Sequence, residues 1–232
     1  MELLVVLGLP LLGTLLLALL GARRFAAELN VGISFATLIA AALLVARVIR
    51  HGPLLVWHDQ FFVDSFNVFL VALTAFVGFT TAIFSRPYMR IEEHHGRLNS
   101  RRLRLYHSMY QLFMAAMFLA LLTNNMGLLW VAMEAATLST VLLVSLYRTK
   151  ASLEAAWKYF ILCGVGIALA LFGTILLYFA AQQALGHEGM TALLWTHLNA
   201  VKGQLEPRVM GLAFVFLLVG YGTKVGLAPL HS

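Results

Sequence analysis

The sequence has few charged side chains, and this scarcity narrows the class of protein. Charged residues make up 11% of the 232 residues, against 61% hydrophobic ones. This balance excludes a water-soluble domain, because so few polar groups cannot cover its surface. A single cysteine, Cys163, excludes an internal disulfide. No glycine-rich phosphate loop, nucleophile triad or dinucleotide fingerprint occurs, so the sequence predicts no soluble-enzyme chemistry and no bound cofactor.

The excess of positive charge, six at neutral pH, does not indicate nucleic-acid binding. Most lysines and arginines lie in loops between long apolar runs, which is the distribution of a protein oriented in an anionic membrane. The expected surroundings are therefore a lipid bilayer, with no nucleic-acid partner.

Long stretches almost free of charge predict about seven transmembrane helices, since about 20 apolar residues cross the hydrocarbon core. We expect Pro87 to end the third helix by breaking its hydrogen bonding, and Thr123, Asn124 and Asn125 to form a tight turn between the fourth and fifth. The predicted spans are residues 3–22, 29–46, 65–85, two within 105–147, 158–181 and 209–230. The sequence thus predicts an all-α membrane protein.

The distribution of basic residues predicts the orientation of these spans. Ten of the 16 lysines and arginines lie in loops after the first, third and fifth spans, and four lie on the opposite side. Because cytoplasmic loops carry the excess of lysine and arginine, the amino terminus is predicted outside, in an inner (cytoplasmic) membrane.

A group of metal-ligand residue types, Glu92, Glu93, His94 and His95, lies on the arginine-rich loop. Adjacent residues of this kind are far more often a solvated linker than ligands that converge on one ion. We predict no metal site.

Two charges fall inside predicted spans, Glu134 and Lys224. Each costs roughly 2.5–3.5 kcal/mol at the centre of a spanning helix, and such residues usually mark ion or substrate paths. Small residues flank Glu134, so other helices can approach it closely. The alternative is a structural ion pair that fixes helix register.

Lys224 lies among residues that weaken a helix: Gly220, Gly222, Gly226 and Pro229. This density predicts a last helix broken near Lys224, as in transporters whose interrupted backbone lines a cavity. The alternative is a lysine that reaches the headgroups from a continuous helix.

Lys158 is more ambiguous than either residue, because it lies near the cytoplasmic start of the sixth span. His107, Tyr110 and Gln111 are weak candidates for an entry beside it.

A lysine whose proton affinity depends on a nearby carboxylate can load and release protons, so Glu134 and Lys224 predict a proton relay. Their depths, about 12 Å and about 22 Å from the outer helix ends at 1.5 Å per residue, count against direct contact. Lysine's reach or a bridging water would close this gap.

Three stretches resemble one known family: NNMGLLWVAMEAATLSTVLLV, RTKASLEAAWKYFILCGVGIALALFGTILLY and GYGTKVGLAPLHS. They are similar to the antiporter-like membrane subunits shared by respiratory complex I, group 4 hydrogenases and multi-subunit sodium/proton antiporters. The second stretch most resembles the hydrogenase-4 component F branch. In this family a helix-five glutamate and a helix-seven lysine form the central charge pair, and they align with Glu134 and Lys224. The helix-six lysine of some branches aligns with Lys158.

The resemblance implies a proton-translocating subunit of a multi-subunit redox complex, with membrane and peripheral partner subunits and no redox centre of its own. It also implies an amino-terminal segment, residues 1–104, followed by a partial antiporter-like repeat, residues 105–232. Relatives continue past the position of Ser232, so we expect a fragment with an incomplete first inverted repeat. Three alternatives stay open: a cation/proton antiporter subunit without a redox partner, a seven-helix photoreceptor with retinal on Lys224, and a structural anchor.

Overall fold

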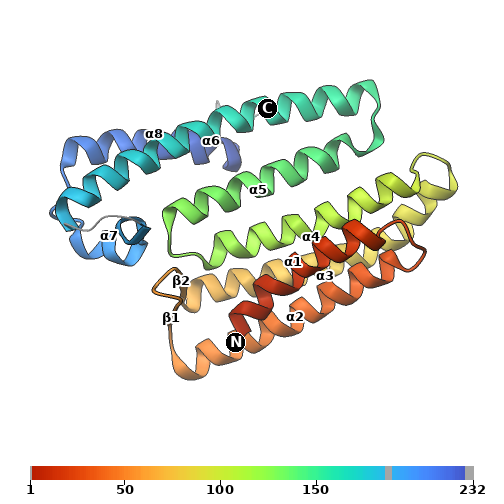
Figure 1. Ribbon diagram of the computed structural model, residues 1–232, viewed down its shortest axis with the longest axis horizontal. Helices are drawn as coiled ribbons and strands as arrows, with labels where there is room; N and C mark the ends of the chain where they lie inside the picture. Colours follow the sequence, from red (N-terminus) through yellow and green to blue (C-terminus); the bar gives the residue numbers. More distant parts are fainter. Residues whose placement is uncertain (1, 186–189, 228–232) are drawn as a thin grey trace.

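The computed structural model describes residues 2–185 and 190–227, and it is almost entirely helical (Figure 1). Within this part of the chain, seven helices are long and apolar enough to cross a membrane, which confirms the predicted all-α membrane fold. The long helices are α1 (Glu2–Leu20), α2 (Ala26–His51), α3 (Ser65–His94), α4 (Ser100–Leu122), α5 (Met126–Val144), α6 (Lys150–Leu185) and α8 (Pro207–Val225). The short elements are β1 (Leu54–Val56), β2 (Phe61–Val63), η1 (Ser145–Tyr147), η2 (Met190–Leu193) and α7 (Trp195–Val201).

The helices form two groups that meet at α4 and α5. Helices α1 to α4 pack on one another, α4 also packs on α5, and α6 packs on both α5 and α8 (Figure 1). Helix α4 is the central element, with 56% of its span buried against 17% for α8. The main apolar core therefore lies between α1, α2, α3 and α4, around residues such as Leu44, Val71 and Phe118. The predicted division at residue 104 falls near the start of α4 and stays a prediction.

The third helix contradicts one prediction, because α3 continues through Pro87 to His94. Proline removes one backbone donor, but its fixed φ is helical, and transmembrane helices tolerate it where neighbouring groups hold the chain. Here Arg86 and Arg90 form ion pairs with Glu28 of α2 and hold the segment around Pro87 against that helix.

Other helices also extend beyond the predicted spans. Helix α2 runs to His51, past Arg47 and Arg50, and α6 starts at Lys150, eight residues before the predicted start. Absence of charge marks the part of a helix inside hydrocarbon, whereas the helix itself continues into the headgroup region, where charged side chains reach water.

The last helix ends close to the predicted break. Helix α8 stops at Val225, one residue after Lys224, and Gly226 adopts a left-handed φ of 72°. The N–H groups of Gly226 and Leu227 both donate to the Gly222 carbonyl, a glycine C-cap. Pro229, on which the predicted break also rested, lies outside the described residues.

The predicted turn between α4 and α5 is confirmed, and it joins three parts of the chain. The Asn124 side chain donates to the Asp59 carbonyl at 2.7 Å and to Thr196 Oγ1 at 2.9 Å. Its backbone N–H donates to the Gln60 carbonyl, and its carbonyl accepts from the Trp195 N–H, each at 2.7 Å. The turn thus connects the β1–β2 hairpin loop, the start of α5 and the start of α7.

The loop of the β1–β2 hairpin has an unfavourable backbone conformation that depends on the bonds from Asn124. Trp57, His58 and Asp59 have φ values of 57°, 51° and 62°, although none is glycine. Left-handed backbone is unfavourable for such residues and persists only where surrounding contacts fix it. The bonds from Asn124 to the carbonyls of Asp59 and Gln60 supply such contacts.

Helices α6 and α8 approach closely through small residues. A Cβ atom built on Gly220 would lie 2.6 Å from Ala170 N and 2.7 Å from the Gly166 carbonyl oxygen. Close backbone approach of this kind is how transmembrane helices gain packing energy without a hydrophobic driving force between them. The crossing therefore requires glycine at position 220.

We predict opposite effects for one substitution at two glycines of α8. Gly220→Ala should lower the free energy of unfolding by about 1–3 kcal/mol, because the added methyl overpacks the crossing. Gly211→Ala, where a Cβ meets nothing within 4 Å of the described residues, should be neutral or stabilising by up to about 1 kcal/mol, since alanine favours the helix. Unfolding of the purified protein in detergent measures the free energy of unfolding of both variants. Equal changes for the two substitutions would contradict the close crossing of α6 and α8 at Gly220.

Candidate functional site

Glu134 lies in the middle of α5, on the helix face that contacts α6 and α8. Trp130, one turn before it, donates from Nε1 to the Ile167 carbonyl of α6 at 2.8 Å. Thr137, one turn after it, is buried and contacts α8 through its hydroxyl. Residues three and four apart share a helix face, so the Glu134 carboxylate is directed towards protein on the α6 and α8 side.

Lys224 reaches the same face from α8. Its ammonium donates a hydrogen bond to Thr137 Oγ1, and the Cys163 side chain of α6 lies within electrostatic range of it. The Glu134 carboxylate lies close enough for a favourable electrostatic interaction with it. The structure therefore brings the two predicted charges to the same junction of α5, α6 and α8. The Thr137 hydroxyl accepts from Lys224 there and donates its own proton to the Met133 carbonyl.

Two polar atoms at this junction are buried without a hydrogen-bond partner among the described residues: Glu134 Oε2 and Tyr221 OH. Such groups cost about 1–3 kcal/mol each, so they are rare and need an explanation. A bound water, a bound ion or a catalytic role is the usual explanation for such a group.

Further hydroxyl and thiol groups extend the polar contacts along α6. Tyr159 OH lies 3.1 Å from Thr140 Oγ1, and the Cys163 thiol is a near neighbour of the Tyr159 hydroxyl. Because Cys163 is also a neighbour of Lys224, polar groups follow one another from Lys224 to Thr140. We name Glu134, Thr137, Cys163 and Lys224 the junction cluster.

The difference in depth expected from the sequence is resolved by where the two helices start. Glu134 and Lys224 lie eight and 17 residues after the first residues of α5 and α8. Figure 1 shows α8 starting farther out than the first residues of α5, near α7, so equal counts along the two helices do not give equal depths. The Lys224 ammonium meets α5 at Thr137, one turn deeper than Glu134.

Lys158 is not brought to the junction cluster. Its ammonium forms an ion pair with Glu154 at 2.6 Å, and both side chains are more than half exposed. The next residue, Tyr159, is the one whose side chain faces α5. A part for Lys158 in proton transfer stays a prediction.

The other weak candidates lie in the amino-terminal helices. Gln111 donates to Asn30 Oδ1 at 2.8 Å and to Ser34 Oγ at 3.0 Å, and Tyr110 OH donates to the Gly78 carbonyl. These bonds join α4 to α2 and α3, so the residues form a buried polar layer rather than an entry beside Lys158. From the sequence, Thr137 counted only as one of the small and hydroxyl residues that flank Glu134, and Cys163 had no functional weight. The i,i+3 spacing from Glu134 was the signal for Thr137.

Comparisons with known proteins match the segment that carries this site to a family model. Residues 123–232 match the family model described as the NADH:quinone oxidoreductase/Mrp antiporter transmembrane domain. This match confirms the predicted resemblance to the antiporter-like subunits and argues against the photoreceptor alternative.

Among individual proteins, the chain is 48% identical over 223 residues to a hydrogenase-4 component F homolog from Methylacidiphilum infernorum, covering 96% of this chain and 45% of that protein. It is 27% identical over 180 residues to NADH-quinone oxidoreductase subunit N from Coxiella burnetii, covering 75% of this chain and 34% of that protein. The chain therefore spans less than half the length of these relatives.

Two solved structures share the fold. A chain of the archaeal membrane-bound sulfane sulfur reductase superposes with a TM-score of 0.83 at 20% identity, over 98% of this chain and 45% of that chain. A chain of respiratory complex I from Thermus thermophilus superposes with a TM-score of 0.67 at 27% identity, over 97% of this chain and 45% of that chain.

The junction cluster predicts different effects for two substitutions at Thr137. Thr137→Val keeps the shape but removes the oxygen that accepts from Lys224, whereas Thr137→Ser keeps it. We expect Thr137→Val to slow proton transfer by about tenfold, the equivalent of losing one charge-assisted hydrogen bond of about 1.5 kcal/mol. Thr137→Ser should stay close to wild type in proton-uptake rates of the reconstituted native complex. Equal rates for both variants would contradict a role for this hydroxyl.

Proposed function

We propose that this chain belongs to a membrane subunit that moves protons through Glu134 and Lys224 while other subunits perform redox chemistry. The observation that carries the proposal is the part-buried contact of Lys224 with Thr137, one helical turn from Glu134. An acid and a base at one junction of membrane helices have the chemistry that proton transfer requires. The printed names of the relatives, a hydrogenase-4 component and an NADH-quinone oxidoreductase subunit, support the redox setting.

The proposed transfer uses the electrostatic dependence of each group on the other. While Glu134 is a carboxylate, it stabilises the Lys224 ammonium; once Glu134 accepts a proton, that stabilisation is lost and proton release from Lys224 is favoured. The Thr137 hydroxyl holds the lysine near α5. Lys158 is proposed only as a member of the relay outside the junction cluster. Its ion pair with Glu154 would have to break before it could take part in proton transfer.

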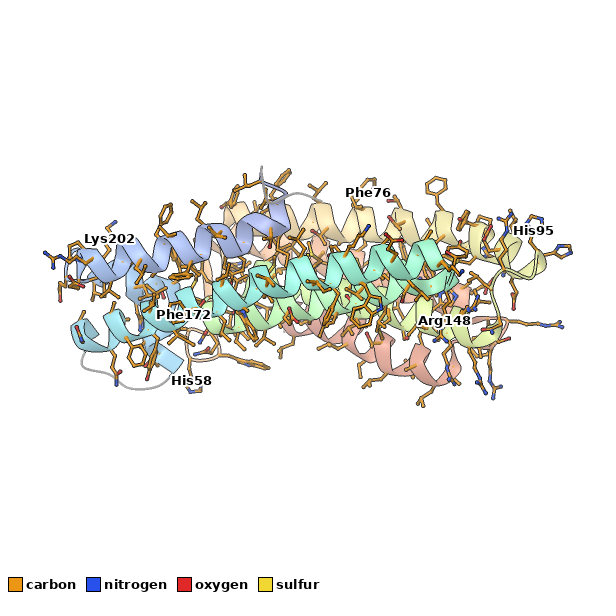
Figure 2. All side chains as sticks on the ribbon, turned by 90° about the horizontal axis from the view of Figure 1, so that it is seen from above. His58, Phe76, His95, Arg148, Phe172 and Lys202 are labelled. Carbon is orange, nitrogen blue, oxygen red and sulfur yellow. The ribbon has the colours of Figure 1, made fainter. Side chains whose placement is uncertain are left out.

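The proposed orientation places the amino terminus outside an inner (cytoplasmic) membrane. Figure 2 shows His95 and Arg148 at one end of the helices and His58 and Lys202 at the other. The end with His95 and Arg148 also carries the arginine-rich connection between α3 and α4, so it is the proposed cytoplasmic end.

Replacing one carboxylate with an amide tests the relay. In the native complex reconstituted in vesicles, Glu134→Gln should reduce proton uptake at least about tenfold, a barrier change of about 1.4 kcal/mol. The control is Asp59→Asn, the same chemical change at a half-exposed carboxylate of the hairpin loop, which should leave uptake unchanged.

The same vesicles distinguish proton transport from cation exchange. Uptake that continues without sodium supports the proposed function, whereas uptake that requires sodium supports the antiporter alternative. If Glu134→Gln leaves proton uptake unchanged, the proposed relay is contradicted and the structural-anchor alternative is favoured.

A further inference from the structure

A second polar site lies away from the junction cluster, at the arginine-rich end of the amino-terminal helices. It is a cavity of about 450 Å³ whose lining includes Arg23, Arg24, Arg86, Arg90 and His107. These residues come from the connection between α1 and α2, from α3 and from α4. No residue of α5, α6 or α8 lines it, so the proposed proton relay does not account for it.

Two of the four arginines are held by an ion-pair network at one side of the cavity. Glu28 Oε1 accepts from Arg86 Nη2 at 2.9 Å and from Arg86 Nε at 3.1 Å, and Arg90 binds the same oxygen. One carboxylate oxygen thus orients two guanidinium groups without neutralising both, so positive charge remains on this side.

The other two arginines have no such partner. Neither Arg23 nor Arg24 forms an ion pair within the described part of the chain, and both side chains are exposed on the turn that follows α1. The cavity lining contains one carboxylate, Glu93. Four guanidinium groups around a single lining carboxylate create a concave surface of positive potential.

A buried histidine borders the cavity and supplies an independent indication of a ligand. His107 is 4% exposed, and its Nδ1 atom has no hydrogen-bond partner among the described residues. An imidazole nitrogen buried without a partner is unfavourable unless a ligand bonds to it. Since His107 is among the lining residues, its imidazole borders the space between the arginines.

We propose that this cavity binds a phosphate group, with the arginines pairing its oxygens and His107 donating a hydrogen bond to it. The guanidinium fork matches phosphate oxygens in a bidentate arrangement, which a lysine cannot reproduce. The cavity lies at the arginine-rich end of the membrane helices, where lipid headgroups are expected, so an anionic phospholipid headgroup is the favoured source. Basic pockets between helices on the cytoplasmic side typically hold such headgroups.

This proposal is independent of the Glu134 and Lys224 relay, and its test measures ligand binding instead of proton transfer. Native mass spectrometry of the complex counts phospholipids retained from mixtures of cardiolipin and phosphatidylcholine. The test variant is the double substitution Arg23→Gln/Arg24→Gln. The matched control is Arg101→Gln/Arg148→Gln, which removes two exposed arginines at the same end but outside the cavity. Equal thermal unfolding and subunit composition verify that both variants are folded.

We expect the test variant to weaken cardiolipin retention at least about tenfold, with the control close to wild type. A second arm titrates inorganic phosphate followed by phosphorus NMR. Phosphate binding that depends on Arg23 and Arg24, without cardiolipin retention, would support the site with free phosphate as its source. Cardiolipin and phosphate binding that are both insensitive to the test variant, or occupation by an acidic segment of a partner subunit, would overturn the proposal.

Discussion

A charged side chain inside hydrocarbon is costly, so the protein must surround it, and this constraint organises the carboxyl-terminal helices. Glu134 and Lys224 both lie within spans that lipid would otherwise cover. The close crossing of α6 and α8 at Gly220 brings the last turn of α8 near α5, and lysine's long side chain covers the remaining distance to Thr137. The polar contact between Lys224 and Thr137 therefore depends on the close packing of small residues between α6 and α8.

A similar dependence links the two groups of helices. Asn124 fixes a hairpin loop with three left-handed residues and the start of α7, while Asn125 caps α5 through its bonds to the N–H groups of Gly127 and Leu128. The position of Glu134 along α5 is thus set from the same turn that anchors the amino-terminal hairpin. Because the turn bonds to both groups, we infer that it holds them in register.

Several features of this structure could be predicted from the sequence, because they follow from transfer free energies and local turn chemistry. Uncharged stretches predict the seven spans, and the short amides predict the turn at Asn124. The same reasoning failed at Pro87, where the wider contacts of Arg86 and Arg90 with Glu28 hold the segment in place. The sequence also did not indicate which side chains of one helix contact another helix. Periodicity along α6 does not show that Tyr159 contacts α5 while Lys158 is exposed. These contacts depend on the angles at which the helices cross, and packing across the whole chain sets those angles.

The central claim is that Glu134 and Lys224 act as one coupled unit, and a double-mutant cycle on proton uptake tests it most directly. The measurement compares the native complex with Glu134→Gln, Lys224→Gln and the double variant. If the two residues form one relay, the double variant loses no more activity than the more impaired single variant. Losses that multiply, as they do for independent sites, would contradict the account.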